Sequence, residues 1–275
     1  MTENPGIVYF LLATTADRVE MAITAIRTMC HRYPNWRMIA VLQGHTPAEV
    51  AWLKAAAAEA SLFWPVILPE PVGMHNAKML GLEAIMRNCG DQPFAVVSVD
   101  DDMEFVDRTD LEPAIAWAQR PDIGLVSGGW INHESRLENH KTPPDFVNQA
   151  IVYTGGGLCF DRKIAELLLT LPRAKYYSDN TEWSMRVYVA GYVNGRYRGS
   201  VAIHRVCKKG GRRAWVNAGE EKVACDYRLL EMKKAKAADR PGAAHNDQYL
   251  IGTEADLTDL AKRLHKQNRE VLTRG

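Results

Sequence analysis

The chain has 275 residues, of which 47% are hydrophobic and 24% charged, with 34 Lys and Arg against 33 Asp and Glu. A chain of this length and composition can bury a large core, so disordered and fibrous classes are excluded. No apolar run approaches the roughly 20 residues that span a bilayer, and Glu3 and Pro5 stand where a signal peptide would need basic and apolar residues. The five cysteines contain no CxxC pair, which indicates reduced thiols. The sequence therefore predicts a cytoplasmic protein with no membrane partner.

Short apolar runs alternate with amphipathic stretches along the chain. The expected strands span 6–14, 36–42, 62–68, 94–99 and 123–127, and the expected helices span 18–31, 47–60, 76–88, 110–119 and 161–170, with a further helical stretch over 257–272. Thr46 and Glu49 form a capping-box pattern with Pro47 at the first helical position, which predicts where the second helix begins. Strands that alternate with helices indicate an α/β fold with a mostly parallel sheet, here as one domain with a basic C-terminal extension.

The charge is unevenly distributed between these segments. Residues 196–240 contain 13 Lys and Arg but only 5 Asp and Glu, so the remainder of the chain is acidic. A basic segment on an acidic protein indicates contact with an anionic partner, and the alternative is a solvated, lysine-rich surface.

Three adjacent carboxylates, Asp100, Asp101 and Asp102, follow the strand expected over 94–99. Ligands of open α/β sheets bind outside the carboxyl ends of the strands, so a binding site is expected here. In an extended segment Asp100 and Asp102 would point to one side and Asp101 away from it. Two carboxylates on one side suit Mg²⁺ or Mn²⁺ and leave positions for phosphate oxygens. The alternative is an acidic turn that caps the next helix.

Other phosphate-binding motifs are absent from the sequence. It contains no GxxxxGK[ST] loop, and no GxGxxG follows the first strand. The glycines 155–157 follow an apolar run, which predicts either a tight turn between strands or a close backbone approach to a ligand.

Five motifs in a consistent order resemble a known family. They are FLLATTADRVEM (10–21), HNAKMLGLEAI (75–85), VVSVDDDMEF (96–105), YTGGGLCFDRKIAELL (153–168) and SDNTEWSMRVYVAGY (178–192). Over about residues 6–205 the chain resembles GT-A glycosyltransferases of the family-2-like kind, with partial similarity to the polypeptide GalNAc-transferase branch. The resemblance implies a Rossmann-like GT-A catalytic domain over 1–205. From their basic and glycine-rich sequence, residues 206–275 are expected to form a basic extension that serves as a lid and acceptor-binding segment.

The resemblance implies roles for the residues of a donor site. Asp100 and Asp102 would hold Mn²⁺ (or Mg²⁺) on the donor's diphosphate, with His204 as the third ligand. Imidazole beside two carboxylates suits Mn²⁺ better than an all-oxygen set does. The other residues of the donor site would be Thr14, Thr15, Asp17, Lys78 on the diphosphate, and Asp101 within the acidic motif. The implied donor is a nucleotide sugar, with a UDP-sugar favoured.

The sequence departs from the family at two places. Gln43 stands where members often place an acid that binds uracil, and an amide can still hydrogen-bond a base edge. Asn180 stands where inverting members usually place their base, and an amide cannot accept the acceptor's proton. Either Asp179 or Glu182 takes this role, or the enzyme works without that base. The retaining GalNAc-transferase branch has a Glu-Asn-x-Glu stretch that resembles Asp-Asn-Thr-Glu.

Aromatic, glycine and basic residues are the candidates for acceptor and donor-sugar contacts. They are Trp130, Gly156, Gly157, Lys208, Arg212, Arg213 and Trp215. Basic pairs between glycines suit a loop that closes over a diphosphate or binds a polyanion. The favoured acceptor is a hydroxymethylated pyrimidine in DNA, as in bacteriophage enzymes that modify their genomes, which would place the protein in the host cytoplasm.

Other acceptors and other classes of protein remain open from the sequence. The transferase alternatives are transfer to a cytosolic saccharide, a lipid-linked sugar or a protein. The alternatives outside that class are a nucleotidyltransferase, a nucleotide-sugar-binding protein without transfer activity, and a DNA-binding accessory protein.

Overall fold

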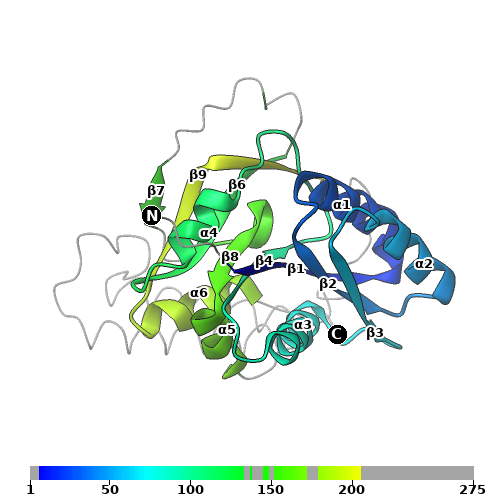
Figure 1. The fold of residues 1–275 in the computed structure, drawn as a ribbon, viewed down its shortest axis with the longest axis horizontal. Coiled ribbons are helices and arrows are strands. Elements are labelled where there is room, and N and C mark those ends of the chain that lie inside the picture. The colour runs from blue at the N-terminus through cyan, green and yellow to red at the C-terminus, as the bar shows by residue number, and fades with distance from the viewer. Residues whose placement is uncertain (1–5, 133–136, 138–144, 149–151, 172–178, 206–275) are drawn as a thin grey trace, which may run out of the picture.

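The computed structural model describes residues 6–132, 137, 145–148, 152–171 and 179–205 (Figure 1). The strands are β1 (Ile7–Thr15), β2 (Arg37–Gln43), β3 (Leu62–Leu68), β4 (Phe94–Val99), β5 (Met103–Glu104), β6 (Ile123–Ile131), β7 (Phe146–Asn148), β8 (Leu158–Asp161) and β9 (Val193–His204). The helices are α1 (Val19–Arg32), α2 (Pro47–Ala56), α3 (Met74–Cys89), α4 (Glu112–Ala118), α5 (Arg162–Leu169) and α6 (Asp179–Val189).

One mixed sheet organises these elements. Its strand order is β3-β2-β1-β4-β8-β6-β9-β5, with β7 paired to β9 outside this path. Strands β1 to β4 are parallel to one another, whereas β8 is antiparallel to both β4 and β6. Because β1 and β4 are parallel neighbours, the residues that follow them lie at the same edge of the sheet.

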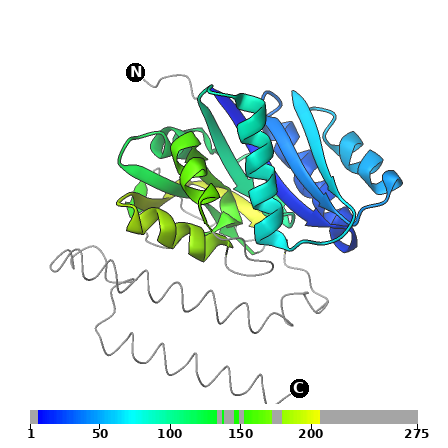
Figure 2. The same ribbon diagram turned by 90° about the horizontal axis from the view of Figure 1, so that it is seen from below.

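Helices cover both faces of the sheet (Figure 1). Helices α1, α2 and α4 lie on one face, and α3, α5 and α6 lie on the other, where Figure 2 shows α3 running along the sheet with α5 and α6 beside it. No helix in the described part of the chain is long and apolar enough to cross a membrane.

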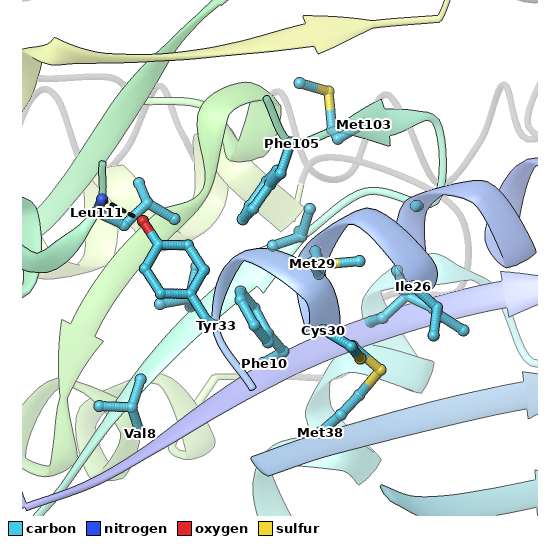
Figure 3. Packing of buried hydrophobic residues seen from close by; sticks show 14 of the residues in the cluster. Val8, Phe10, Ile26, Met29, Cys30, Tyr33, Met38, Met103, Phe105 and Leu111 are labelled. Carbon is cyan, nitrogen blue, oxygen red and sulfur yellow. Dashed lines mark hydrogen bonds between the residues drawn. The ribbon is translucent and has the colours of Figure 1, made fainter. Parts of the chain in front are cut away.

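The core on the α1 face includes an aromatic cluster that fixes the segment after β5. Phe10 of β1 packs against Tyr33, Trp36 and Phe105. The Tyr33 hydroxyl donates to the Thr109 carbonyl at 3.0 Å and accepts from the Leu111 amide at 2.7 Å, the bond drawn in Figure 3. Buried hydroxyls need such partners, so this pair holds the chain between β5 and α4 against α1.

The α/β layout with a mostly parallel first half is confirmed. The capping box at Thr46 is present, with the Thr46 hydroxyl accepting from the Glu49 amide. Helix α2 ends at Ala56 rather than residue 60, because the chain turns through the alanines that follow. Strand β6 continues to Ile131, four residues beyond the expected end, since β9 pairs along its length.

The antiparallel strand β8 was not expected. The sequence predicted a helix from residue 161, and helix α5 begins at Arg162, but the strand Leu158–Asp161 comes directly before it. Four residues are too few to show a period of two, so the pattern gives no strand signal there. The predicted extension over 206–275, with its helical stretch, lies outside the described residues, and the domain boundary at 205 stays a prediction.

Helix α3 lies close to the sheet because of a glycine. A Cβ on Gly81 would meet Leu11 Cδ1 at 2.3 Å and Val41 Cγ2 at 3.1 Å, and both side chains are fully buried. The same helix carries His75 and Lys78, so this close approach also sets the depth of the functional residues described below.

We expect Gly81→Leu to lower the free energy of unfolding by about 1–3 kcal/mol or more, because the added side chain overpacks a closed interface. Denaturant unfolding followed by circular dichroism measures this. Arg87→Leu introduces the same residue at an exposed position of α3 and should change the free energy by less than about 0.5 kcal/mol. Equal effects of the two substitutions would contradict the packing argument.

Candidate functional site

The acidic triplet lies in a turn directly after β4. The strand ends at Val99, and the Met103 amide bonds back to the Asp100 carbonyl at 3.3 Å. The expectation that Asp100 and Asp102 share one side of an extended segment is therefore wrong. In a turn, successive side chains do not alternate between two sides as they do in an extended strand. Asp101 and Asp102 instead contact the same residue.

That partner is Arg18, which follows β1. Its Nη2 lies 2.6 Å from Asp101 Oδ1 and 2.7 Å from Asp102 Oδ2, and its Nε donates to Asp101 Oδ2 at 3.0 Å. The Thr14 hydroxyl donates to Asp101 Oδ2 at 2.7 Å. Since Thr14 and Asp101 are almost fully buried, these contacts tie the ends of β1 and β4 together.

Asp100 has separate partners from the other face of the sheet. Lys78 Nζ of α3 lies 2.9 Å from Asp100 Oδ1, and the Thr154 hydroxyl donates to Asp100 Oδ2 at 2.5 Å. Lys78 is fully buried, whereas about a third of the Asp100 side chain is exposed. Lys78 therefore lies beneath Asp100, and the carboxylate is the group that faces outward.

Strand β9 brings His204 to the site. Met103 of β5 pairs with His204, and the Arg205 amide donates to the Asp102 carbonyl at 2.8 Å. His204 Nε2 lies 3.4 Å from Asp102 Oδ1, a buried oxygen to which no described residue donates a well-formed hydrogen bond. The sequence prediction that His204 belongs with the acidic triplet agrees with this placement.

The charges of the cluster do not cancel. Three carboxylates face two permanent cations, Lys78 and Arg18, so one negative charge remains while His204 is neutral. Burial raises the pKa of Asp101 to about 6 even beside Arg18, and the carboxyl is still ionised at pH 7. Burial also raises the pKa of Asp102, but His204 and Arg18 outweigh it and hold the pKa below its ordinary value.

The residues fit a divalent ion in their chemistry. A buried carboxylate oxygen beside an imidazole nitrogen, a second and partly exposed carboxylate, and one uncompensated negative charge are what Mn²⁺ or Mg²⁺ requires. Asp102 and His204 are adjacent, and Asp100 would join them from the turn. Within the described ranges, however, no three His, Cys, Asp or Glu side chains are already gathered as a ligand set.

The other predicted donor residues are placed in different ways. Thr14 is buried against Asp101, Thr15 is half-buried, and Asp17 is exposed. Gln43 is 1% exposed, and its side chain accepts from the Val72 amide at 2.9 Å and lies 3.4 Å from the Thr14 carbonyl. In this arrangement Gln43 fixes the loop before α3, and its contact with a nucleotide base stays a prediction.

Helix α6 carries the predicted catalytic acids. Asp179 is its first residue, and Asn180 has a buried Oδ1 without a hydrogen-bond partner among the described residues. Glu182 is fully buried, with Oε2 at 3.9 Å from His75 Nδ1. Trp183 Nε1 donates to His75 Nε2 at 3.3 Å. His75 of α3 therefore contacts two consecutive residues of α6, Glu182 and Trp183. This places Glu182 between α3 and α6, where its side chain is inaccessible to solvent.

The glycine segment packs on β6. A Cβ on Gly156 would lie 2.2 Å from the Gly129 carbonyl oxygen, and a Cβ on Gly155 would lie 2.6 Å from the Trp130 ring. Gly157 has a φ of +94°, which favours glycine. The close approach predicted for Gly156 is therefore to the protein's own backbone. Lys208, Arg212, Arg213 and Trp215 lie outside the described residues.

Sequence reasoning gave no role to Arg18, His75, Thr154 or Arg196. Two signals were available for Arg18 and Thr154. Three adjacent carboxylates need a counter-charge, and Arg18 lies in the motif that follows β1. Thr154 directly precedes the glycines.

Comparisons with known proteins concern the fold. No protein-family model and no curated protein matches the chain. Among solved structures, the mannosyltransferase PcManGT from Pyrobaculum calidifontis, in complex with GDP-Man and Mn²⁺, is 18% identical, with a TM-score of 0.59 over 99% of this chain and 84% of that one. S. aureus TarS in complex with UDP-GlcNAc is 10% identical, with a TM-score of 0.61 over 84% of this chain and 71% of that one.

GalNAc-T7, solved with UDP, GalNAc and Mn²⁺, is 12% identical, with a TM-score of 0.63 over 96% of this chain. The chain spans 55% of the length of that protein. At these identities the likeness establishes the fold, so the expected GT-A fold of glycosyltransferases is confirmed.

We expect Arg18→Gln to lower the free energy of unfolding by about 3–5 kcal/mol at pH 7, because it leaves Asp101 buried and charged without its partner. Denaturant unfolding measures the change. Arg27→Gln removes an exposed arginine from α1 and should have almost no effect. Adding Asp101→Asn to Arg18→Gln should recover much of the loss. A cost for Arg18→Gln no larger than that of Arg27→Gln would contradict this role.

Proposed function

We propose that the protein is a metal-dependent glycosyltransferase that moves a sugar from a nucleotide-sugar donor to a hydroxyl group of an acceptor. The observation that carries the proposal is the contact between Asp102 and His204 at the carboxyl end of β4, with Asp100 in the same turn, in a fold shared with solved glycosyltransferases. Mannosyltransferase PcManGT and GalNAc-T7 were both solved with Mn²⁺, and all three compared structures hold a nucleotide, a nucleotide sugar or both.

In the transfer, the acceptor oxygen forms a bond to the anomeric carbon while the bond from that carbon to the diphosphate oxygen breaks. The acceptor loses a proton, and a nucleoside diphosphate leaves. Bound Mn²⁺ or Mg²⁺ would neutralise negative charge on this leaving group. Asp102, His204 and Asp100 are the residues proposed to hold it.

The surrounding residues support these ligands. Lys78 and the Thr154 hydroxyl each contact one oxygen of Asp100, so together they fix the orientation of that carboxylate. Arg18 holds Asp102 by Oδ2 and leaves Oδ1 toward His204. Lys78 therefore acts here by orienting Asp100, although the resemblance implies a diphosphate contact for this residue. Fixed ligands cost less reorganisation when charge develops.

For the proton of the acceptor, we propose Asp179 as the accepting group. Glu182 is fully buried against His75, and Asn180 has no basic oxygen. Asp179 begins α6, and Ser184 ties the same helix to Val152, two residues before Thr154. Helix α6 is thus coupled to the segment that holds Asp100.

The favoured acceptor is a hydroxymethylated pyrimidine in DNA, and the favoured donor is a UDP-sugar. The basic balance of residues 196–240 supports a polyanionic acceptor. A target base in a duplex would have to leave the stack to reach the site.

With Mn²⁺ and GDP-mannose, UDP-GlcNAc or UDP-GalNAc, we expect one donor to yield nucleoside diphosphate. Asp100→Asn, Asp102→Asn and His204→Ala should each lower this turnover by at least about 100-fold, because each removes a proposed ligand. The coupled release of nucleoside diphosphate measures the rate. Asp91→Asn, on a fully exposed aspartate, is the matched control and should leave it unchanged.

Metal binding can be followed without turnover. Mn²⁺ should raise the melting temperature of the wild-type protein and of Asp91→Asn, and it should not raise that of Asp102→Asn or His204→Ala. A protein that binds a donor but releases no diphosphate with any acceptor would instead be a nucleotide-sugar-binding protein.

The DNA acceptor has its own test. Incubation with Mn²⁺, a mixture of nucleotide sugars and DNA that contains hydroxymethylcytosine should produce a nucleoside heavier by one sugar, detected by mass spectrometry after digestion. Unmodified-cytosine DNA is the control and should stay unchanged. Diphosphate release without a modified nucleoside would retain the transferase and exclude this acceptor.

A further inference from the structure

A second polar group, Arg196, lies beside the segment that contains Tyr153 and the glycines. The guanidinium carbon of Arg196, on β9, lies 5.2 Å from the ring centroid of Trp130. Trp130 in turn meets Tyr153 edge-on, with ring centroids 6.2 Å apart. Tyr153 is 48% exposed, so this corner is open to solvent on one side.

The corner is connected directly to the proposed metal ligands. Tyr153 precedes Thr154, whose hydroxyl bonds to Asp100, and the Trp130 ring lies against the backbone of Gly155. A group bound by Tyr153 and Arg196 would therefore approach Asp100 from the side of the glycine segment.

Arg196 is held there without a counter-charge. Among the described residues no carboxylate pairs with it, and its Nε is buried without a hydrogen-bond partner. Burial, together with the charge of Arg198, lowers its pKa below the ordinary value of arginine. A half-buried charge of this kind costs free energy unless an anion compensates it.

The neighbouring residues keep this position open for Arg196. A Cβ on Gly129 would lie 3.0 Å from Arg196 Nη2, so the guanidinium occupies space that a side chain would fill. Arg198, two residues later, is exposed and forms a bidentate pair with Asp145. Strand β9 thus carries a surface arginine paired with a carboxylate and, over the Trp130 ring, an arginine with no carboxylate partner in the described part of the chain.

We propose that Arg196, Trp130 and Tyr153 form an acceptor subsite that binds an oxyanion, a phosphate or carboxylate group carried by the acceptor. The guanidinium fork binds either oxyanion through two parallel hydrogen bonds, Trp130 holds the guanidinium in place, and the exposed Tyr153 ring packs against the sugar or base that carries the oxyanion. The identification of the bound molecule as the acceptor rests on the proposed glycosyltransferase function, but the predicted binding needs neither donor nor metal.

The test is calorimetric titration of the full chain without metal or donor. Two pairs of probes differ only in the anion: phenyl β-D-glucuronide against phenyl β-D-glucoside, and 5-hydroxymethyl-dCMP against 5-hydroxymethyldeoxycytidine. We expect at least one anionic probe to bind about 10–100-fold more tightly than its neutral match, the range of one charge-assisted contact. Preference in the first pair identifies a carboxylate on a sugar, and preference in the second identifies a nucleotide phosphate.

Substitutions assign the preference to Arg196. Arg196→Gln should abolish the difference within a pair, and Arg196→Lys should keep part of it, because lysine retains charge but not the fork. Arg198→Gln is the matched control and should keep the full difference. Tyr153→Ala should weaken the charged and neutral probes equally.

Three results would overturn the proposal: equal binding of charged and neutral probes by the wild-type protein, equal losses in Arg196→Gln and Arg198→Gln, or binding of none of the probes. Melting temperatures separate binding from folding. Arg196→Gln removes an uncompensated charge, so it should not be less stable than the wild-type protein, whereas an arginine needed for the fold would lower the melting temperature when replaced. Diphosphate release, measured separately on the wild-type protein, tests the transferase function independently.

Discussion

The structure depends on how three consecutive carboxylates are accommodated at the end of a buried strand. Asp101 and Asp102 are nearly inaccessible, and both depend on Arg18, while Asp100 turns the other way toward Lys78. Arg18 follows β1, and Lys78 lies on α3, so the two cations come from opposite sides of β4. The same charges that form the site therefore hold the first strands and their helices together. While His204 is neutral one negative charge is left over, so either a further cation or a proton on His204 balances the cluster.

The sequence could predict the first half of the fold much better than the second half. In the first half, each strand is a continuous apolar run, and each helix has a clear period or cap, so β1 to β4 and α1 to α3 lie within one to four residues of expectation. In the second half, β8 has four residues, β7 has three and β5 has two, and their partners come from distant parts of the chain. Such strands form because a neighbouring strand presents free backbone groups, which no local pattern records.

The same distinction between local pattern and long-range packing applies to the residues of the site. Residue types that chemistry demands, such as the acidic triplet and His204, could be found from the sequence, because motif order places them at strand ends. Geometry that depends on long-range packing could not. The local sequence does not show that Asp102 rather than Asp100 lies beside His204. Nor does it show that Gln43 accepts a hydrogen bond from the Val72 amide, or that Glu182 is buried against His75. Arg196 escaped notice for a related reason: an arginine on a strand is ordinary until its lack of a partner is visible.

The two halves of the sheet therefore contribute differently to chemistry. The parallel half carries Arg18, Lys78 and the acidic triplet, where every charge except one is compensated within the fold. The mixed half carries Trp130, Tyr153 and Arg196, where no described carboxylate compensates the positive charge of the arginine. Thr154 connects the two by bonding to Asp100 directly after Tyr153. A surplus negative charge that suits a metal and a surplus positive charge that suits an anion thus lie on either side of one short turn. Under the proposed function, the metal-bound diphosphate would bind on the negative side of this turn and the anionic acceptor on the positive side. Each reactant would then have its own charged subsite, with the transferred sugar between them.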